Sequence, residues 1–201
     1  MNKAEFSTRI ALLTDELFEA NEYFLGYIHL YDKQVSNIDE LNTAPGFFQL
    51  TLKAFLELFA LKLARLFDDD KKSISLFKIP GWIEQNKELR ETLDQSKKQI
   101  ETIKKYLTDS KANIDSLKML RDKLFAHTDK KQLSGNIWQD AGITIQNYRG
   151  LISAAHEIIC ICKLILDEPT PLLGMGIETD VDYIVYLLSK ANDTLYDKKV
   201  F

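Results

Sequence analysis

The 201-residue sequence contains little glycine, proline or cysteine, and it has no long hydrophobic run. Only eight Gly and four Pro residues are present, too few for a turn-rich β fold of this length, which favours helices. No apolar stretch reaches the roughly 18 residues that span a membrane, and no N-terminal segment resembles a signal peptide. These absences predict a soluble, cytoplasmic, all-α protein with no membrane partner.

The sequence also lacks a convincing metal site. Cys160 and Cys162 stand two residues apart on an expected helix, so they point in different directions and should remain reduced. His156 lies one turn before Cys160, but Cys162 points away from that pair. The acidic run Asp68 to Asp70 more naturally forms a helix cap and ion pairs near Arg65. We therefore expect no metal and no other cofactor.

What the sequence does contain is helical periodicity. Hydrophobic residues recur at helical spacing and predict helices over the ranges 3–31, 45–68, 87–107, 111–127, 143–167 and 179–194. The helix over 45–68 is apolar on nearly every side and should be the most buried element. The polar helix over 87–107 is typical of one arm of an exposed hairpin.

A shorter helix is expected within residues 71–86, opened by Ser73 or Ser75 and disturbed by Pro80 and Gly81. Together these elements predict an up-down helical bundle with a long polar helical hairpin and an extra C-terminal helix. We place the bundle at residues 1–168. A C-terminal loop and helix, residues 169–201, should pack on it.

Positive charge is concentrated between residues 97 and 131. That segment holds ten Lys or Arg and five Asp or Glu, a net +5, so with −4 overall the rest of the chain carries −9. A basic segment on an acidic body can attract a phosphate backbone. It can equally be the solvated face of two helices, and charge alone favours that second interpretation.

An arginine interrupts the hydrophobic stripe of the expected helix 111–127. At about 100° per residue, Arg121 falls inside the apolar arc formed by Ile114, Leu117, Leu120, Leu124 and Phe125. The opposite, polar side carries Lys118, Asp122 and Lys123. A cation in an apolar arc needs an acid of its own chain, a path to water, a subunit interface or a ligand anion.

His127 stands at the end of the same helix, where an imidazole interacts favourably with the helix dipole. Arg121 and His127 are six residues apart, so they point about 120° apart on an ideal helix. Both can reach one anion only if the last turn opens, or if two copies of the helix meet across a dimer.

The segment RDKLFAH, residues 121–127, resembles the active-site motif of the HEPN superfamily of helical-bundle proteins. The order of ALKLARLFDDD, SISLF and LKMLRDKLFAHTD is similar to the abortive-infection U branch of that superfamily, over about residues 40–165. This resemblance implies a metal-independent endoribonuclease, acting as a toxin or antiviral effector. It also implies a homodimer whose two motif helices form one composite cleft for RNA.

By the same resemblance, Arg121 would bind the scissile phosphate, His127 would act at the reacting oxygens, and Asp122 would support them. These residue types suit the chemistry, because histidine exchanges protons near neutral pH and a guanidinium holds phosphate oxygens. Possible RNA contacts outside the motif are Lys118, Lys123 and Lys130. Two alternatives are a catalytically silent module that binds a nucleotidyltransferase or an antitoxin, and a purely structural dimer.

Overall fold

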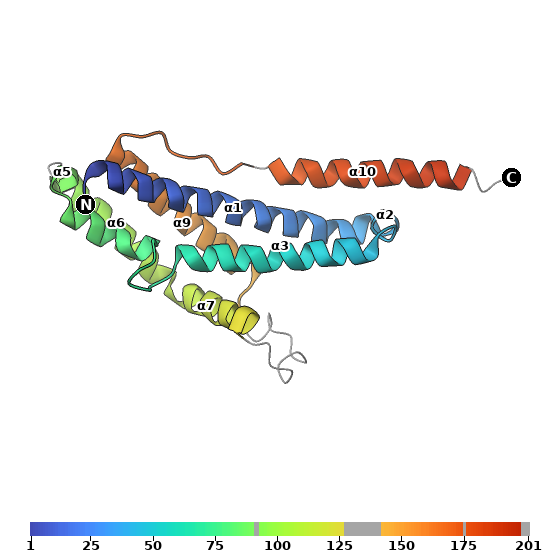
Figure 1. Cartoon of the computed structure of the whole chain (residues 1–201), viewed down its shortest axis with the longest axis horizontal. Coiled ribbons are helices and arrows are strands. Elements are labelled where there is room, and N and C mark those ends of the chain that lie inside the picture. Colours follow the sequence, from blue (N-terminus) through green and yellow to red (C-terminus); the bar gives the residue numbers. More distant parts are fainter. Residues whose placement is uncertain (91–92, 127–141, 175, 198–201) are drawn as a thin grey trace. The chain divides into compact units, whose positions relative to one another are not determined.

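The computed structural model of the protein describes residues 1–90, 93–126, 142–174 and 176–197 (Figure 1). This part of the chain contains helices and no strand, which confirms the all-α fold class. The helices are α1 (Lys3–Ser36), α2 (Ile38–Leu41), α3 (Pro45–Leu66), the 3-10 helix η1 (Leu76–Lys78), α4 (Ile79–Gln85), α5 (Lys87–Arg90), α6 (Leu93–Asp109), α7 (Lys111–Ala126), α9 (Ile145–Leu166) and α10 (Gly176–Asp197).

Pro80 and Gly81 do not disturb the short helix that the sequence suggested. Ser75 precedes η1, which continues directly into α4. Pro80 lies in the first turn of α4, where a backbone N–H would have no helical partner, so the missing donor has no cost. The expected disturbance was wrong because a proline interrupts a helix only beyond its first turn.

The polar region folds as α5 and α6, and both α4 and α5 pack against α6. Only Ser110 separates α6 from α7. The Ser110 N–H donates to the Tyr106 carbonyl at 3.1 Å, and the Ile114 N–H donates to the Ser110 carbonyl at 2.9 Å. The helical hydrogen-bond pattern therefore continues across the junction, so α7 follows the polar helix without an intervening loop.

The chain divides into two compact units that alternate along the sequence: residues 1–19 with 60–172, and residues 20–59 with 173–201. The sequence predicted a single division of the chain, after residue 168. In the first unit, α6 packs against α9, and α7 packs against both α6 and α9. Its largest fully buried side chains are Phe6, Ile10, Leu17, Leu63, Leu66, Phe67, Leu76, Ile79, Ile83, Ile103 and Ile114.

Helix α9 in this unit begins at a capping box. The Thr144 hydroxyl accepts the Asn147 N–H at 3.2 Å, and the Asn147 side chain accepts the Thr144 N–H at 2.8 Å. The helix ends at Asp167, which adopts a left-handed conformation with φ of 61°. These two local signals fix α9 within two residues of its expected range, which positions its buried face against α7.

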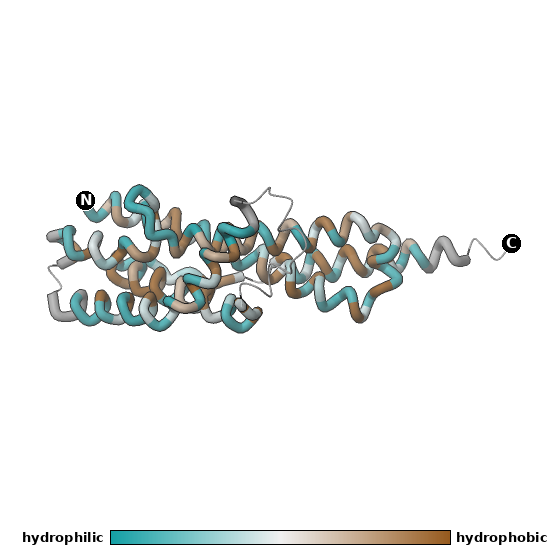
Figure 2. Tube along the Cα trace, turned by 90° about the horizontal axis from the view of Figure 1, so that it is seen from below, coloured by the Kyte–Doolittle hydropathy of each residue, from teal (hydrophilic) through white to brown (hydrophobic). Residues whose placement is uncertain are grey.

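The second unit has its own apolar core. It joins the second half of α1 with α2, the first part of α3 and α10, through Leu30, Leu41, Phe48, Leu52, Val181 and Val185. Helix α10, the expected C-terminal helix, therefore packs against the other helices of the second unit through one face. Figure 2 shows hydrophobic and hydrophilic residues alternating along these helices.

Helix α3 is not the most buried element, contrary to expectation. Phe47 is 61% exposed and Leu50 is 67% exposed, although Phe48 and Leu52 on the same helix are buried. The sequence prediction was wrong because apolarity on every side does not provide a neighbour on every side. Exposed apolar side chains also occur on α10, at Tyr183, Ile184, Tyr186 and Leu187.

Within the described residues, every helix is too short or too polar to cross a membrane.

Candidate functional site

The hydrophobic stripe of α7 anchors the candidate site. Ile114, Leu117 and Leu120 are completely buried, as their positions in the apolar arc predicted. They face the first unit's core, where α7 packs on α6 and α9. Burial of these three side chains fixes the rotation of α7 and so determines where its polar residues lie.

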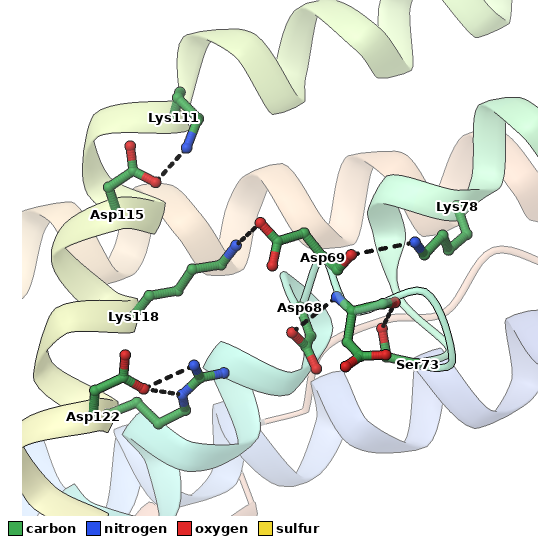
Figure 3. Close-up of polar contacts among 10 residues, drawn as sticks. Asp68, Asp69, Ser73, Lys78, Lys111, Asp115, Lys118 and Asp122 are labelled. Atoms are coloured by element: carbon green, nitrogen blue, oxygen red, sulfur yellow. Dashed lines mark hydrogen bonds and ion pairs between the residues drawn. The ribbon is translucent and has the colours of Figure 1, made fainter. Parts of the chain in front are cut away.

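Arg121 lies at the edge of this stripe rather than inside the core. Its side chain is 28% exposed, so the guanidinium reaches solvent while its stem lies along the apolar surface. Nε and Nη2 both donate to Oδ1 of Asp122, at 2.9 and 2.8 Å (Figure 3). The sequence left four ways to compensate the charge of Arg121. The structure shows two of them together: an acid of the same chain, Asp122, and access to water.

The Arg121–Asp122 pair leaves the arginine available for other anions. Asp122 is largely exposed, and the two residues are neighbours on the surface of α7. Exposed ion pairs contribute about 0–1 kcal/mol, so another anion can displace this carboxylate at small cost. Asp122 can thus orient the guanidinium before an anion arrives.

Lys118 does not lie on the polar side of α7, contrary to expectation. Its side chain is only 16% exposed, and Nζ lies 2.9 Å from Oδ2 of Asp69 (Figure 3). The ammonium also lies 5.4 Å from the centre of the Phe77 ring. The hydrogen bond and charge of Lys118 lower the pKa of Asp69. Because its charge is already compensated, Lys118 is a weaker candidate for an RNA contact than the sequence suggested.

The acidic run after α3 forms a turn held by local hydrogen bonds. Asp68 Oδ1 accepts the Asp70 N–H at 3.3 Å, and Asp70 Oδ1 accepts the Lys72 N–H at 2.7 Å. The Ser73 hydroxyl donates to the Asp70 carbonyl at 2.8 Å. This turn presents Asp69 to α7, whereas the expected partner, Arg65, pairs with Glu16 of α1 instead.

Two of the six candidate residues, His127 and Lys130, lie outside the described residues. Lys123 is half-buried on α7. The structure therefore brings Arg121 and Asp122 together and gives Lys118 a separate partner. The Arg121–His127 relation stays a prediction from the sequence.

No group of three or more His, Cys, Asp or Glu side chains in the described ranges is arranged to hold a metal ion. His156 Nε2 hydrogen-bonds the Pro171 carbonyl oxygen at 2.8 Å and lies 3.5 Å from the Cys160 sulfur. Cys162 is fully buried, and this burial raises the pKa of its thiol. Both thiols are reduced.

Comparison with known protein families matches residues 3–167 to AbiU2, a family of HEPN domains. The chain belongs to this family. The matched AbiU2 region includes Arg121, Asp122 and His127 and ends before α10. The predicted superfamily and branch are thereby confirmed. No curated protein and no solved structure matches the chain.

The AbiU2 region contains two features that sequence reasoning missed. One is the pairing of Lys118 with Asp69, which are 49 positions apart along the chain, so that no local pattern connects them. The other is a groove beside Glu16 and Arg65, which also come from distant helices. The sequence signal for each was only an acid or a base near the end of an expected helix.

Proposed function

We propose that this AbiU2-family protein is a metal-independent endoribonuclease, acting as a toxin or antiviral abortive-infection effector. The observation that carries the proposal is the position of Arg121, partly exposed on α7, in a chain that belongs to a HEPN family. The proposed catalytic residues are Arg121 and His127, with Asp122 positioning Arg121. Lys123 and Lys130 are proposed phosphate contacts.

The reaction needs only groups that this chain provides. His127 takes the proton from an RNA 2′-hydroxyl, and the resulting oxygen attacks the neighbouring phosphorus. The bond from phosphorus to the 5′-oxygen breaks, and the proton that His127 took passes to that leaving oxygen. The products are a 2′,3′-cyclic phosphate and a 5′-hydroxyl. Arg121 binds the non-bridging oxygens and stabilises their increasing negative charge.

The directions of the two side chains support a homodimer. Arg121 and His127 diverge by about 120° on an ideal helix, so Arg121 of one copy and His127 of the other would serve one phosphate. Phe47 and Leu50 are exposed apolar side chains of the second unit and are available for contacts with another chain.

The test compares RNA cleavage by the full chain with cleavage by Arg121→Ala and His127→Ala, each with and without a chelator. Matched controls are Arg149→Ala, an exposed arginine near the start of α9, and His29→Ala in the second unit. Loss of either catalytic residue should lower the cleavage rate at least 100-fold, whereas the controls should change it little. Unchanged cleavage by His127→Ala, or loss of activity with chelator alone, would contradict the proposal.

The second candidate function is a catalytically silent module that binds a nucleotidyltransferase or an antitoxin. It is favoured by the engagement of the cations on α7 with carboxylates, Arg121 with Asp122 and Lys118 with Asp69. In that case the unmodified chain would cleave no RNA, and Arg121→Ala would change partner binding in place of cleavage.

A further inference from the structure

Helix α3 has a second apolar stripe, on its solvent-exposed side. The stripe consists of Phe47, Leu50, Ala54 and Leu58, all in the part of α3 that belongs to the second unit. Ala54 is half-buried and the other three are exposed. At about 100° per residue the four fall within an arc of about 80°, whereas Leu52, which faces the core of the second unit, lies about 160° from Ala54. Residues spaced by three and four positions adjoin on a helix, so these side chains form one continuous surface, the α3 stripe.

The α3 stripe has the same spacing in both directions from Ala54. Leu50 stands four residues before Ala54, and Leu58 stands four residues after it. If a second α3 packs on the stripe in the antiparallel direction, about a two-fold axis at Ala54, Leu50 of each copy meets Leu58 of the other. A two-fold contact between identical chains requires this kind of self-complementary surface.

The charged residues beside the stripe favour the antiparallel direction. Lys53 and Glu57 lie on the same edge of the stripe, where their charged atoms are 3.8 Å apart. An antiparallel two-fold places this edge against the same edge of the second copy. The order along the contact is then Glu57, Lys53, Lys53, Glu57, so each lysine meets a glutamate of the other copy and the four charges sum to zero. In a parallel pair this edge would instead face the edge that carries Thr51, which offers no charge.

Ala54 and Phe47 suit the remaining positions of such a contact. Ala54 would lie where the helices cross, and a small side chain there lets two helix axes approach to about 8 Å. Phe47 lies at the end of the stripe, and its ring packs edge-on against buried Phe48, with 5.3 Å between the ring centroids. An aromatic side chain already held by a buried neighbour loses little freedom when it enters an interface.

We propose that the α3 stripe binds α3 of a second copy of this chain, packed antiparallel about a two-fold axis at Ala54. The stripe spans about 16 Å of helix, which is short for an interface, so the association should be weak and should depend on protein concentration. This contact does not rest on the proposed ribonuclease function, because the stripe belongs to the second unit and Arg121 to the first.

Disulfide cross-linking of the full chain tests both the occupant and its direction. The background is Cys160→Ser, in which the remaining thiol, Cys162, is fully buried. Ala54→Cys should form a cross-linked dimer under mild oxidation, because the two copies of position 54 meet at the axis. Phe47→Cys is the matched control. Its two copies would lie about 21 Å apart along an antiparallel pair, so it should not cross-link to itself.

Two mixing experiments sharpen the test. Leu50→Cys and Leu58→Cys chains should cross-link to each other, whereas each alone would place its two thiols about 12 Å apart along the helices and should cross-link at least tenfold more slowly. Lys53→Glu or Glu57→Lys should each lower the yield of the Ala54→Cys dimer about tenfold through like-charge contacts. Mixing these two charge variants should restore the yield, because unlike chains regain both attractive pairs.

Absence of an Ala54→Cys dimer would overturn the proposal, and so would equal cross-linking of Phe47→Cys and Ala54→Cys, which would indicate a parallel or random contact. Cross-linking of Ala54→Cys to another protein in a cell extract, with none between copies, would also overturn it. These results are separate from RNA cleavage. The expected cross-links in a chain that cleaves no RNA would contradict the proposed ribonuclease alone, and cleavage without them would contradict this contact alone.

Discussion

At the scale of single residues, the positive side chains of α7 differ in how their charge is compensated. Arg121 is partly exposed and pairs with its neighbour Asp122, whereas Lys118 is nearly buried and pairs with Asp69 from another segment. A sequence pattern could identify Arg121 as unusual, because it interrupts an apolar stripe. It could not identify the role of Lys118, since the partner of this lysine, the exposed Asp69, comes from a distant segment and is brought beside it only by the fold.

The Asp69–Lys118 pair gives a prediction with a defined pH dependence. Lys118 lowers the pKa of Asp69 below its ordinary value of 3.8, so ionised Asp69 stabilises the folded state. This contribution is complete above the ordinary value and is lost as the pH falls through the lower folded value. Asp69→Asn should therefore reduce the free energy of unfolding at pH 7, by up to about 1 kcal/mol for an exposed carboxylate.

Urea denaturation at a series of pH values measures this effect. The difference between the original chain and Asp69→Asn should shrink to nothing at acid pH. A double-mutant cycle with Lys118→Met isolates the pair, because methionine retains packing against Phe77. A stability difference that persists below both pKa values would show that Asp69 acts through something other than its charge.

At the scale of helices, α7 was the best predicted element, because its buried face follows directly from helical periodicity. Leu117 is fully buried, whereas Met119, two positions further along, is half-exposed. Leu117→Ala should lower the free energy of unfolding by about 2–5 kcal/mol, through lost apolar burial and the cavity left behind. Met119→Ala should cost less than about 1 kcal/mol.

Chemical denaturation of the two variants checks this prediction, with circular dichroism confirming that both remain helical. Equal costs for Leu117→Ala and Met119→Ala would mean that α7 is rotated relative to the core described above.

Helix α3 shows the limit of predicting burial from helical periodicity. Its sequence is apolar around nearly its whole circumference, yet Phe47 and Leu50 are exposed. Periodicity identifies the faces that can be buried, but the number of neighbouring helices decides which of them are buried. Proline placement has a similar limit, because Pro80 ends no helix when it falls in the first turn of α4.

At the scale of the whole molecule, the helical order and the motif segment were enough to predict the family. Helices α1 to α9 lie within the AbiU2 match, and their local signals, such as the Thr144 capping box, are readable in the sequence. The two interleaved units were not predictable in this way, because α1 and α3 each belong to both units. Their separation depends on contacts between distant segments, which a one-dimensional pattern does not contain.

The proposed dimer depends on single residues, on the helix that carries them and on the association of two whole chains. It requires Arg121 from one copy and His127 from the other, so a mixed dimer of Arg121→Ala and His127→Ala subunits retains one complete site out of two. Neither variant contains a complete site alone.

Mixing the two inactive variants under conditions of subunit exchange, and assaying RNA cleavage, tests this claim most directly. Half of the dimers in an equal mixture should be mixed, so about one quarter of the original activity should return. A mixture no more active than either variant alone would contradict the composite active site.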